Sequence, residues 1–170
     1  MRLATERDLD FIMRETIEGA KHGHYVASLL DPRQAQEFRN QLKNVVHYMA
    51  MLRRTDRGDE QITAQLWIYG RKNDDQVGYL LVSEKLPGSI ATDLELYKIG
   101  IRKDRRREGH GRRIVRLFVA VSPPTVKLYA RCLPASETMF RLLKEVGFLH
   151  TNTMPLGTRE LELCSREARK

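Results

Sequence analysis

The sequence predicts an α/β protein built on a mixed sheet, and two patterns indicate it. Apolar residues follow a helical period up to about residue 54, and then alternate with polar residues in segments separated by turns, as in antiparallel hairpins. After residue 111, segments with a helical period alternate with segments typical of strands, as in crossover connections. The predicted order is one strand, two helices, three strands, helix, strand, helix and two strands. At 170 residues, the chain fits a single domain spanning residues 1–170.

A short strand and a helix open the chain. Residues 2–5 are compatible with a strand, and Thr5 with Asp8 has the spacing of a capping box. The first helix should therefore start near Glu6 and end between Gly19 and Gly23.

A second helix is predicted from Asp31-Pro32, because proline is permitted in a first helical turn. Apolar residues at helical spacing extend it to about Arg54. They are Phe38, Leu42, Val45, Val46 and Met49. Thr55–Glu60 is predicted to be a polar loop.

Three strands follow. Ile62–Tyr69 and Val77–Val82 flank a polar turn at residues 72–75, so they should form a hairpin. Pro87-Gly88 breaks the chain, and Leu94–Ile101 is the third strand of this group.

Helices and strands alternate in the rest of the chain. A helix starts after Gly111 and stops at Ser122-Pro123-Pro124. The remaining predicted elements are a strand at Val126–Cys132, a helix at Pro134–Val146 that Gly147 ends, and strands near Phe148–Thr153 and Arg159–Cys164.

Composition excludes several classes of protein. The first residues carry acids and lack an apolar core, so they do not form a secretion signal. No apolar run approaches the roughly 20 residues that a membrane helix needs. The two cysteines, Cys132 and Cys164, are too few for a disulfide framework. The cytoplasm is therefore the expected compartment.

The net charge is +8, and much of it is concentrated, since residues 102–116 hold eight basic and two acidic residues. This stretch is either a solvated surface or a site for a polyanion, a nucleotide cofactor or nucleic acid. At its centre, Gly109-His110-Gly111 lies between a strand and a helix. Glycines let a ligand approach the main chain, and a helix N-terminus presents unpaired N–H groups and a positive dipole end. The arrangement predicts a pyrophosphate site.

This turn differs from two common nucleotide motifs. Arg112-Arg113 follows Gly111, where a Walker loop requires Lys and then Ser or Thr. Ile114 stands where the dinucleotide fingerprint has its third glycine.

Three segments resemble the GNAT superfamily of N-acetyltransferases. Arg106-Arg107-Glu108-Gly109-His110-Gly111 resembles its acyl-CoA loop, Arg/Gln-x-x-Gly-x-Gly/Ala. Glu95–Ile101 is similar to its fourth strand, Glu-Leu-Tyr-x-Leu-x-Val, and Leu142–Phe148 is similar to its Leu-Tyr-x-Lys-x-Gly-Phe. The resemblance covers nearly the whole chain and is strongest from about residue 91 to 150.

The resemblance implies a mixed, mostly antiparallel sheet of six to seven strands, flanked by about four helices, with a V-shaped splay between the central strands. It implies acetyl-CoA as cosubstrate and no metal. Main-chain groups of Ile99 and Ile101 would pair with the pantetheine arm. The pyrophosphate would be held by the main-chain amides of Arg106, Arg107, Glu108, Gly109, His110, Gly111 and Arg112.

Two departures from the family concern the general acid. The tyrosine that protonates the leaving thiolate in many members corresponds to Leu143, and a common asparagine corresponds to Ser136. Ser136, Tyr129 or solvent could serve instead, or no acid is needed.

Glu95 is the candidate general base, because family members often use an acid on this strand. By strand alternation, it shares a face with Tyr97 and Ile99. The need for a base depends on the acceptor. Removing a proton at pH 7 costs roughly 4.6 kcal/mol for a lysine side chain and about 1–1.4 kcal/mol for an α-amine. The alternative role for Glu95 is a solvent-facing strand residue.

His24 and Tyr25 are candidates for acceptor binding, because they lie on a loop that borders the acceptor in the family; loop packing is the alternative. His22 and His24 have no further clustered ligand, so no metal site is predicted. Cys132 would need a base partner to act as a nucleophile.

Three functions remain open. The first is transfer of acetyl from acetyl-CoA to a primary amine of a small molecule or protein, by direct attack in a ternary complex. The second is acetylation of aminoacyl-tRNA, as in the GNAT toxins. The third is a CoA- or nucleic-acid-binding module without activity, which the missing tyrosine motivates. Because GNAT relatives are often dimers, a homodimer is also open.

Overall fold

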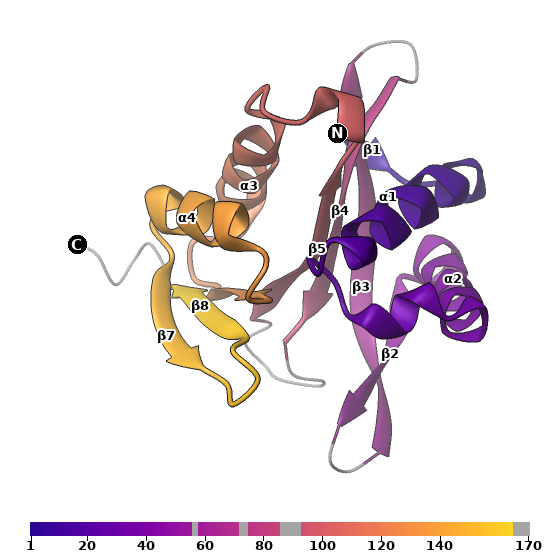
Figure 1. Ribbon diagram of the computed structural model, residues 1–170. Coiled ribbons are helices and arrows are strands. Elements are labelled where there is room, and N and C mark those ends of the chain that lie inside the picture. The colour runs from indigo at the N-terminus through magenta and orange to yellow at the C-terminus, as the bar shows by residue number, and fades with distance from the viewer. Residues whose placement is uncertain (56–57, 72–74, 86–92, 165–170) are drawn as a thin grey trace.

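The computed structural model describes residues 1–55, 58–71, 75–85 and 93–164. These residues form an eight-stranded sheet in the order β1-β3-β4-β5-β6-β8-β7, with β2 paired to β3 beside this path (Figure 1). The strands are β1 (Arg2–Leu3), β2 (Ala50–Thr55), β3 (Gly58–Arg71), β4 (Asp75–Glu84), β5 (Leu94–Ile101), β6 (Leu128–Cys132), β7 (Leu149–Thr153) and β8 (Arg159–Leu163). The α-helices are α1 (Leu9–Lys21), α2 (Pro32–Tyr48), α3 (His110–Val121) and α4 (Glu137–Val146). Short 3₁₀ turns are η1 (Glu6–Asp8), η2 (Ala27–Leu30) and η3 (Lys103–Arg105).

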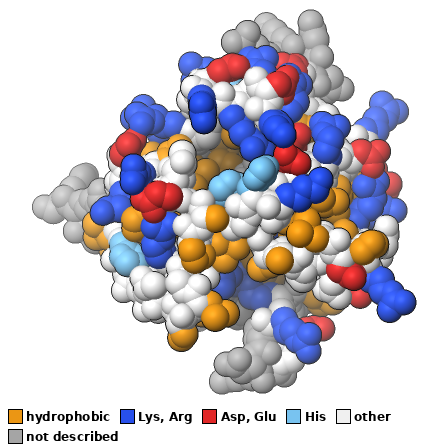
Figure 2. Space-filling model, viewed as in Figure 1, with side chains coloured by type: hydrophobic (Ala, Val, Ile, Leu, Met, Phe, Trp, Pro, Cys, Tyr) orange, Lys and Arg blue, Asp and Glu red, His pale blue; other side chains and the backbone are white. Residues whose placement is uncertain are grey.

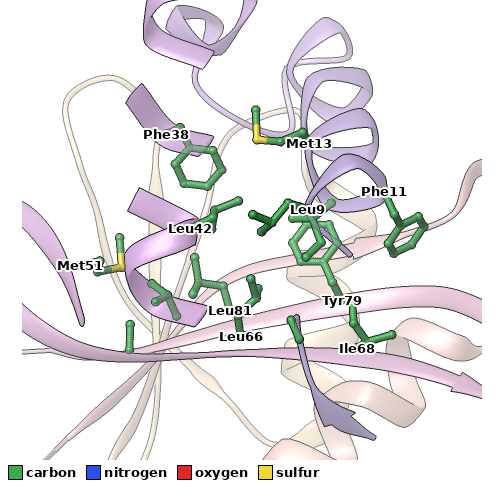
Figure 3. Close-up of a cluster of buried hydrophobic side chains, with 14 of the residues drawn as sticks. Leu9, Phe11, Met13, Phe38, Leu42, Met51, Leu66, Ile68, Tyr79 and Leu81 are labelled. Atoms are coloured by element: carbon green, nitrogen blue, oxygen red, sulfur yellow. The ribbon is translucent and has the colours of Figure 1, made fainter. Parts of the chain in front are cut away.

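Two helical layers cover the sheet, with α1 and α2 on one side and α3 and α4 on the other (Figure 1). Strand alternation separates two apolar cores, because successive residues of β3 and β4 point to opposite faces. The first core joins α1 and α2 to the sheet, and Figure 3 shows Leu9, Phe38 and Leu42 packed over Leu66 and Leu81. The second core lies under α3 and α4. Within the described residues, no helix is long and apolar enough to cross a membrane.

The predicted start of the first helix is confirmed. The main-chain N–H of Thr5 donates to Oδ2 of Asp8 at 2.7 Å, and both halves of the capping box form. The first turn is 3₁₀ and continues directly into α1.

The prediction that the second helix continues to Arg54 is wrong. Helix α2 ends at Tyr48, and Met49 adopts the left-handed conformation with φ 52°. The next residues form β2, which pairs with β3 so that Met51 lies opposite Ile62 and is buried. The apolar residues of this segment fit both a helical and a strand period, and pairing with β3 makes it a strand. The polar loop predicted after Arg54 is therefore also wrong where it is described, because those residues belong to β2 and β3.

The other predicted elements are present, with shifted ends. Leu94–Ile101 agrees with β5 at both ends, whereas β3 and β4 are longer than predicted. The seven-stranded path agrees with the predicted six to seven strands, and β2 adds the eighth. Of the predicted turn at residues 72–75, only Asp75 is described, and it belongs to β4. The predicted break at Pro87-Gly88 lies outside the described residues.

The sheet divides between β5 and β6. These strands run parallel and pair only from Leu94 to Leu96, opposite Leu128 to Ala130. Beyond that point, β5 pairs with β4 and β6 pairs with β8. The predicted V-shaped splay is therefore present, and we call it the split.

Candidate active site

The turn before α3 has two residues in the left-handed region. Arg107 has φ 66° and Gly109 has φ 78°. Glycine adopts this conformation without steric cost. A Cβ added to Gly109 would have no atom within 4 Å, so this face of the turn is open. The turn can therefore accept a ligand directly against its main chain.

Helix α3 starts immediately after this turn with an uncapped N-terminus. No acidic residue occurs in its first turn, and Gly109 at the N-cap has no side chain. The first main-chain N–H groups of a helix have no acceptor within the helix, and the dipole is positive at that end. The amides of His110, Gly111 and Arg112 are thus positioned to bind an anion.

The acid in the turn, Glu108, is paired with neighbouring basic side chains. Oε2 of Glu108 accepts from Nε of Arg105 at 3.1 Å and lies 3.1 Å from Nε2 of His110. Hydrogen bonds from Arg105 and then His110 lower the pKa of the Glu108 carboxyl. The His110 ring is buried, with 4% exposed, and lies beside Tyr69. The ring therefore packs inside the protein, while the main-chain amide of His110 lies at the start of α3.

The side chains of two arginines in this segment point toward other parts of the protein. Nε of Arg106 donates to the carbonyl of Ile101 at 3.1 Å, and its Nη2 lies 3.7 Å from the Glu15 carboxylate of α1. Arg112 forms an ion pair with Glu145 of α4. Their main-chain groups remain in the turn, and Arg107 is exposed there. The binding of a pyrophosphate by the main-chain amides of Arg106 and Arg112 stays a prediction.

The main-chain carbonyls of Ile99 and Ile101 face the split. The Tyr25 hydroxyl donates to the first and Arg106 to the second. Alternate residues of an antiparallel strand bond to the same side, so both residues turn away from β4. Pairing with a pantetheine arm stays a prediction, and each of these carbonyls already accepts one side-chain hydrogen bond.

A β-bulge changes which residues of β5 share a face. Leu81 of β4 pairs with Lys98 and Val82 pairs with Leu96, so Tyr97 is an extra residue. Tyr97 packs against the first core and Ile99 against the second. The prediction that Glu95, Tyr97 and Ile99 share one face is therefore wrong for Ile99.

Glu95 is buried, with 4% exposed, and both of its carboxylate oxygens are ion-paired. Oε2 accepts from Nη2 of Arg53 at 2.6 Å, and Oε1 accepts from Nε of Arg131 at 2.7 Å. Arg53 also donates to Ser83 and to the carbonyl of Lys85. Glu95 therefore lies at the narrow end of the split, and its role as a base stays a prediction.

Ser136 and His24 meet across the split. Ser136 is the N-cap of α4, and its Oγ lies 3.4 Å from Nδ1 of His24. Burial, followed by the charges of Arg106 and His22, lowers the pKa of His24, so its imidazole is neutral at pH 7. This pair joins a predicted catalytic residue to a predicted acceptor-binding residue.

Two other candidate acids are less well placed. Leu143 is fully buried in the second core, so this position contributes no acid. Burial, with the charges of Glu162 and Asp93, raises the pKa of Tyr129 to about 12, which makes it a weak acid.

Neither a nucleophilic cysteine nor a metal site gains support. Burial raises the pKa of Cys132 to about 11, so its thiol stays protonated at pH 7. Within the described ranges, no group of three or more His, Cys, Asp or Glu side chains is placed to hold a metal ion.

Three basic residues at the narrow end of the split were not predicted. They are Arg53, Lys98 and Arg131. Arg131 could have been found, because it alternates with buried Ala130 and Cys132. Arg53 was not predicted at this site because the segment was assigned to a helix instead of to β2. Lys98 was not predicted because nothing in the sequence marks the bulge that orients it.

The surface reflects this arrangement. Figure 2 shows basic side chains crowded over the upper part of the face, above histidine side chains near its centre. Beside these histidines the surface is hollowed, and the floor of the hollow is apolar.

No protein-family model and no curated protein matches the sequence. Solved structures do match. AAC(6')-Ib in complex with ribostamycin and coenzyme A has a TM-score of 0.69 at 18% identity, over 99% of this chain and 93% of that one. A GNAT superfamily phosphinothricin acetyltransferase from Sinorhizobium meliloti, in complex with AcCoA, has a TM-score of 0.67 at 16% identity. The match covers 95% of this chain and 85% of that one. Ribosomal-protein-alanine N-acetyltransferase from Brucella melitensis has a TM-score of 0.64 at 16% identity, over 96% of this chain and 98% of that one. The split sheet, the open turn before α3 and these matches together show that the chain has the GNAT fold.

Proposed function

We propose that the protein is an acetyl-CoA-dependent N-acetyltransferase. One observation carries the proposal: the uncapped N-terminus of α3, behind the open face of Gly109, lies at the wide end of a split between two parallel strands. The phosphate site is followed along the split by an edge of β5 that is unpaired within the described chain. This arrangement suits a long cofactor that has a pyrophosphate at one end. Two of the matching structures contain coenzyme A or AcCoA, which supports this ligand class.

The residues present fit acetyl-CoA. The amides at the start of α3 face no acid of their own helix, and exposed Arg107, Arg113 and Arg116 add positive charge around them. Leu96 and Cys132 give the α3 side of the split an apolar lining. When bound, acetyl-CoA would supply an acetyl thioester, which is the activated group for transfer to an amine.

The protein's own groups have distinct roles in this proposal. The amides from Arg106 to Arg112 hold the pyrophosphate, and the β5 edge at Ile99 orients the pantetheine arm after Tyr25 releases the carbonyl. Glu95 accepts the proton of the attacking amine through water as the N–C bond forms. As the C–S bond breaks, the leaving thiolate takes a proton from solvent or from Ser136, which His24 contacts.

Calorimetry with CoA tests binding, and release of free thiol from acetyl-CoA tests transfer. The acceptors should be polyamines, peptides and charged tRNA measured side by side, since these separate the small-molecule, protein and tRNA alternatives. We expect CoA to bind and at least one amine to be acetylated. Tight CoA binding without transfer to any acceptor would favour the non-catalytic module, and absence of CoA binding would reject the assignment.

A further inference from the structure

The two faces of the split differ in chemistry at its narrow end. Register between β5 and β6 ends at Leu96 and Ala130, so the next residues flank the opening. On the α3 side, Leu96, Ala130 and Cys132 are buried in the second core. On the α1 side, the charged residues Glu95, Lys98 and Arg131 come together. An apolar chain suits the first face, and a charged acceptor suits the second.

Arg131 presents unused donors at this point. Its Nε bonds to Glu95, and its side chain is 44% exposed. Its two terminal nitrogens have no hydrogen-bond partner among the residues that the structure describes. A guanidinium with a free pair of nitrogens is the group best shaped to bind a carboxylate through two parallel hydrogen bonds.

Lys98 adds a second positive charge close by. Its Nζ lies 4.5 Å from the ring centre of Tyr25, 5.2 Å from that of Phe38 and 5.5 Å from that of Tyr97. No carboxylate of the described chain is within ion-pair distance of it. Burial and the charge of Arg131 lower the pKa of Lys98 to about 8, so the two cations are within electrostatic reach of each other and Lys98 remains mostly charged at pH 7.

The charges at this end do not cancel. Glu95 is shared between Arg53 and Arg131, and Glu160, the register partner of Arg131, already accepts from Asn152. Three cations therefore face two carboxylates. Three aromatic rings would suit a ligand ammonium, but Lys98 already occupies them. A polycationic acceptor would meet like charge here, whereas an acceptor with a negative group would balance it.

We propose that Arg131, backed by Lys98, binds a carboxylate carried by the acceptor, so that the substrate is an amine of the amino-acid type and not a polyamine or an aminoglycoside. This inference rests on the proposed acetyltransferase function. It concerns the acceptor half of the site alone, which allows the two to fail separately.

The test compares free amino acids with their carboxamides, with spermidine and ribostamycin as polycationic acceptors. The measured quantity is the ratio of kcat/KM for each acid to kcat/KM for its amide. Because the acid and amide differ in amine pKa, the ratio is compared between wild type and variants, which cancels that difference. We expect Arg131→Gln to reduce the ratio about 10- to 100-fold, as loss of a charged hydrogen bond does. Lys98→Met should reduce it less, and Arg131→Lys should restore part of it.

Arg141→Gln is the matched control, because Arg141 is an exposed arginine of α4 paired with Glu137. It should leave the ratio unchanged, and Arg131→Gln should leave CoA affinity unchanged. An unaltered ratio in Arg131→Gln, or faster acetylation of spermidine or ribostamycin than of any amino acid, overturns the inference while the acetyltransferase function stands. A wild-type protein that neither binds CoA nor transfers acetyl removes both.

Discussion

The hydroxyl of Tyr25 donates a hydrogen bond to the main-chain carbonyl of Ile99, and so ties the loop after α1 to the edge of β5 at the split. The Tyr79 hydroxyl donates to Tyr25 at 3.1 Å, and Oγ1 of Thr16 lies 2.8 Å from Tyr79. Gly19 makes room for this contact, because a Cβ there would lie 2.6 Å from the Tyr25 ring. The GNAT resemblance assigns main-chain groups of Ile99 to pantetheine, and one of them, the carbonyl, is therefore bound by the protein's own side chain.

Replacing Tyr25 by Phe should release this carbonyl. Because CoA no longer competes with the hydroxyl, we expect its Kd to fall about fivefold, the equivalent of one exchanged hydrogen bond of about 1 kcal/mol. The free energy of unfolding should decrease by about 1 kcal/mol, since Tyr79 loses its acceptor. Calorimetry and urea unfolding measure the two effects. Tyr48→Phe, at an exposed residue of α2, is the control, and an unchanged Kd in Tyr25→Phe would mean that the Tyr25 hydroxyl does not compete with CoA for this carbonyl.

Gly109→Asp should abolish CoA binding, because it places a side chain and a negative charge in the open space before α3. Gly109→Ala separates charge from strain. It keeps the positive φ, which costs a non-glycine residue about 1–2 kcal/mol, but adds no charge. We expect Ala to lower stability and weaken CoA moderately, and Asp to remove binding in calorimetry. Unchanged CoA affinity in the Asp variant would refute the phosphate site.

Glu95→Gln should lower the acetylation rate more than it weakens CoA binding. A general base contributes about 100- to 10,000-fold, so we expect kcat to fall by at least about 100-fold while the Kd for CoA stays the same. Glu162→Gln on β8 is the control, because Glu162 pairs with Lys127 and with neither of the two arginines that bind Glu95. Wild-type kcat with reduced stability would instead assign Glu95 a purely structural role between its two arginines.

Asp8 makes part of the stability dependent on pH. Burial by itself would raise the pKa of Asp8, but hydrogen bonds from Arg2, Thr5 and Gln76 outweigh it and hold the pKa well below its usual value. The stabilisation is therefore complete above the unfolded pKa of about 3.9 and is lost as the pH falls through the lower folded value. Asp8→Asn should reduce the free energy of unfolding by about 2 kcal/mol at pH 7. Urea unfolding should show this difference shrinking below about pH 4; a constant difference would refute the ion pair as its source.

Local patterns predicted the parts of the protein whose conformation depends on neighbouring residues. The turn at Gly109 needs a positive φ, and the helix after it follows from its own apolar period. The capping box at Thr5 and the Gly147 end of α4 are likewise local. Both ends of strand β5 were predicted correctly, because the sequence has a break before it and a turn motif after it.

Contacts between distant segments decided the rest. Met51 lies in a strand because β3 pairs with it, and the bulge at Tyr97 places Ile99 on the face opposite to that predicted. Glu95 meets arginines 42 and 36 residues away in the chain. The sequence by itself therefore determined the turn before α3 and, apart from β2, the order of elements, since these depend mainly on interactions between near neighbours. Only the tertiary structure decided which charges surround the narrow end of the split, because no local pattern specifies which strands will pair.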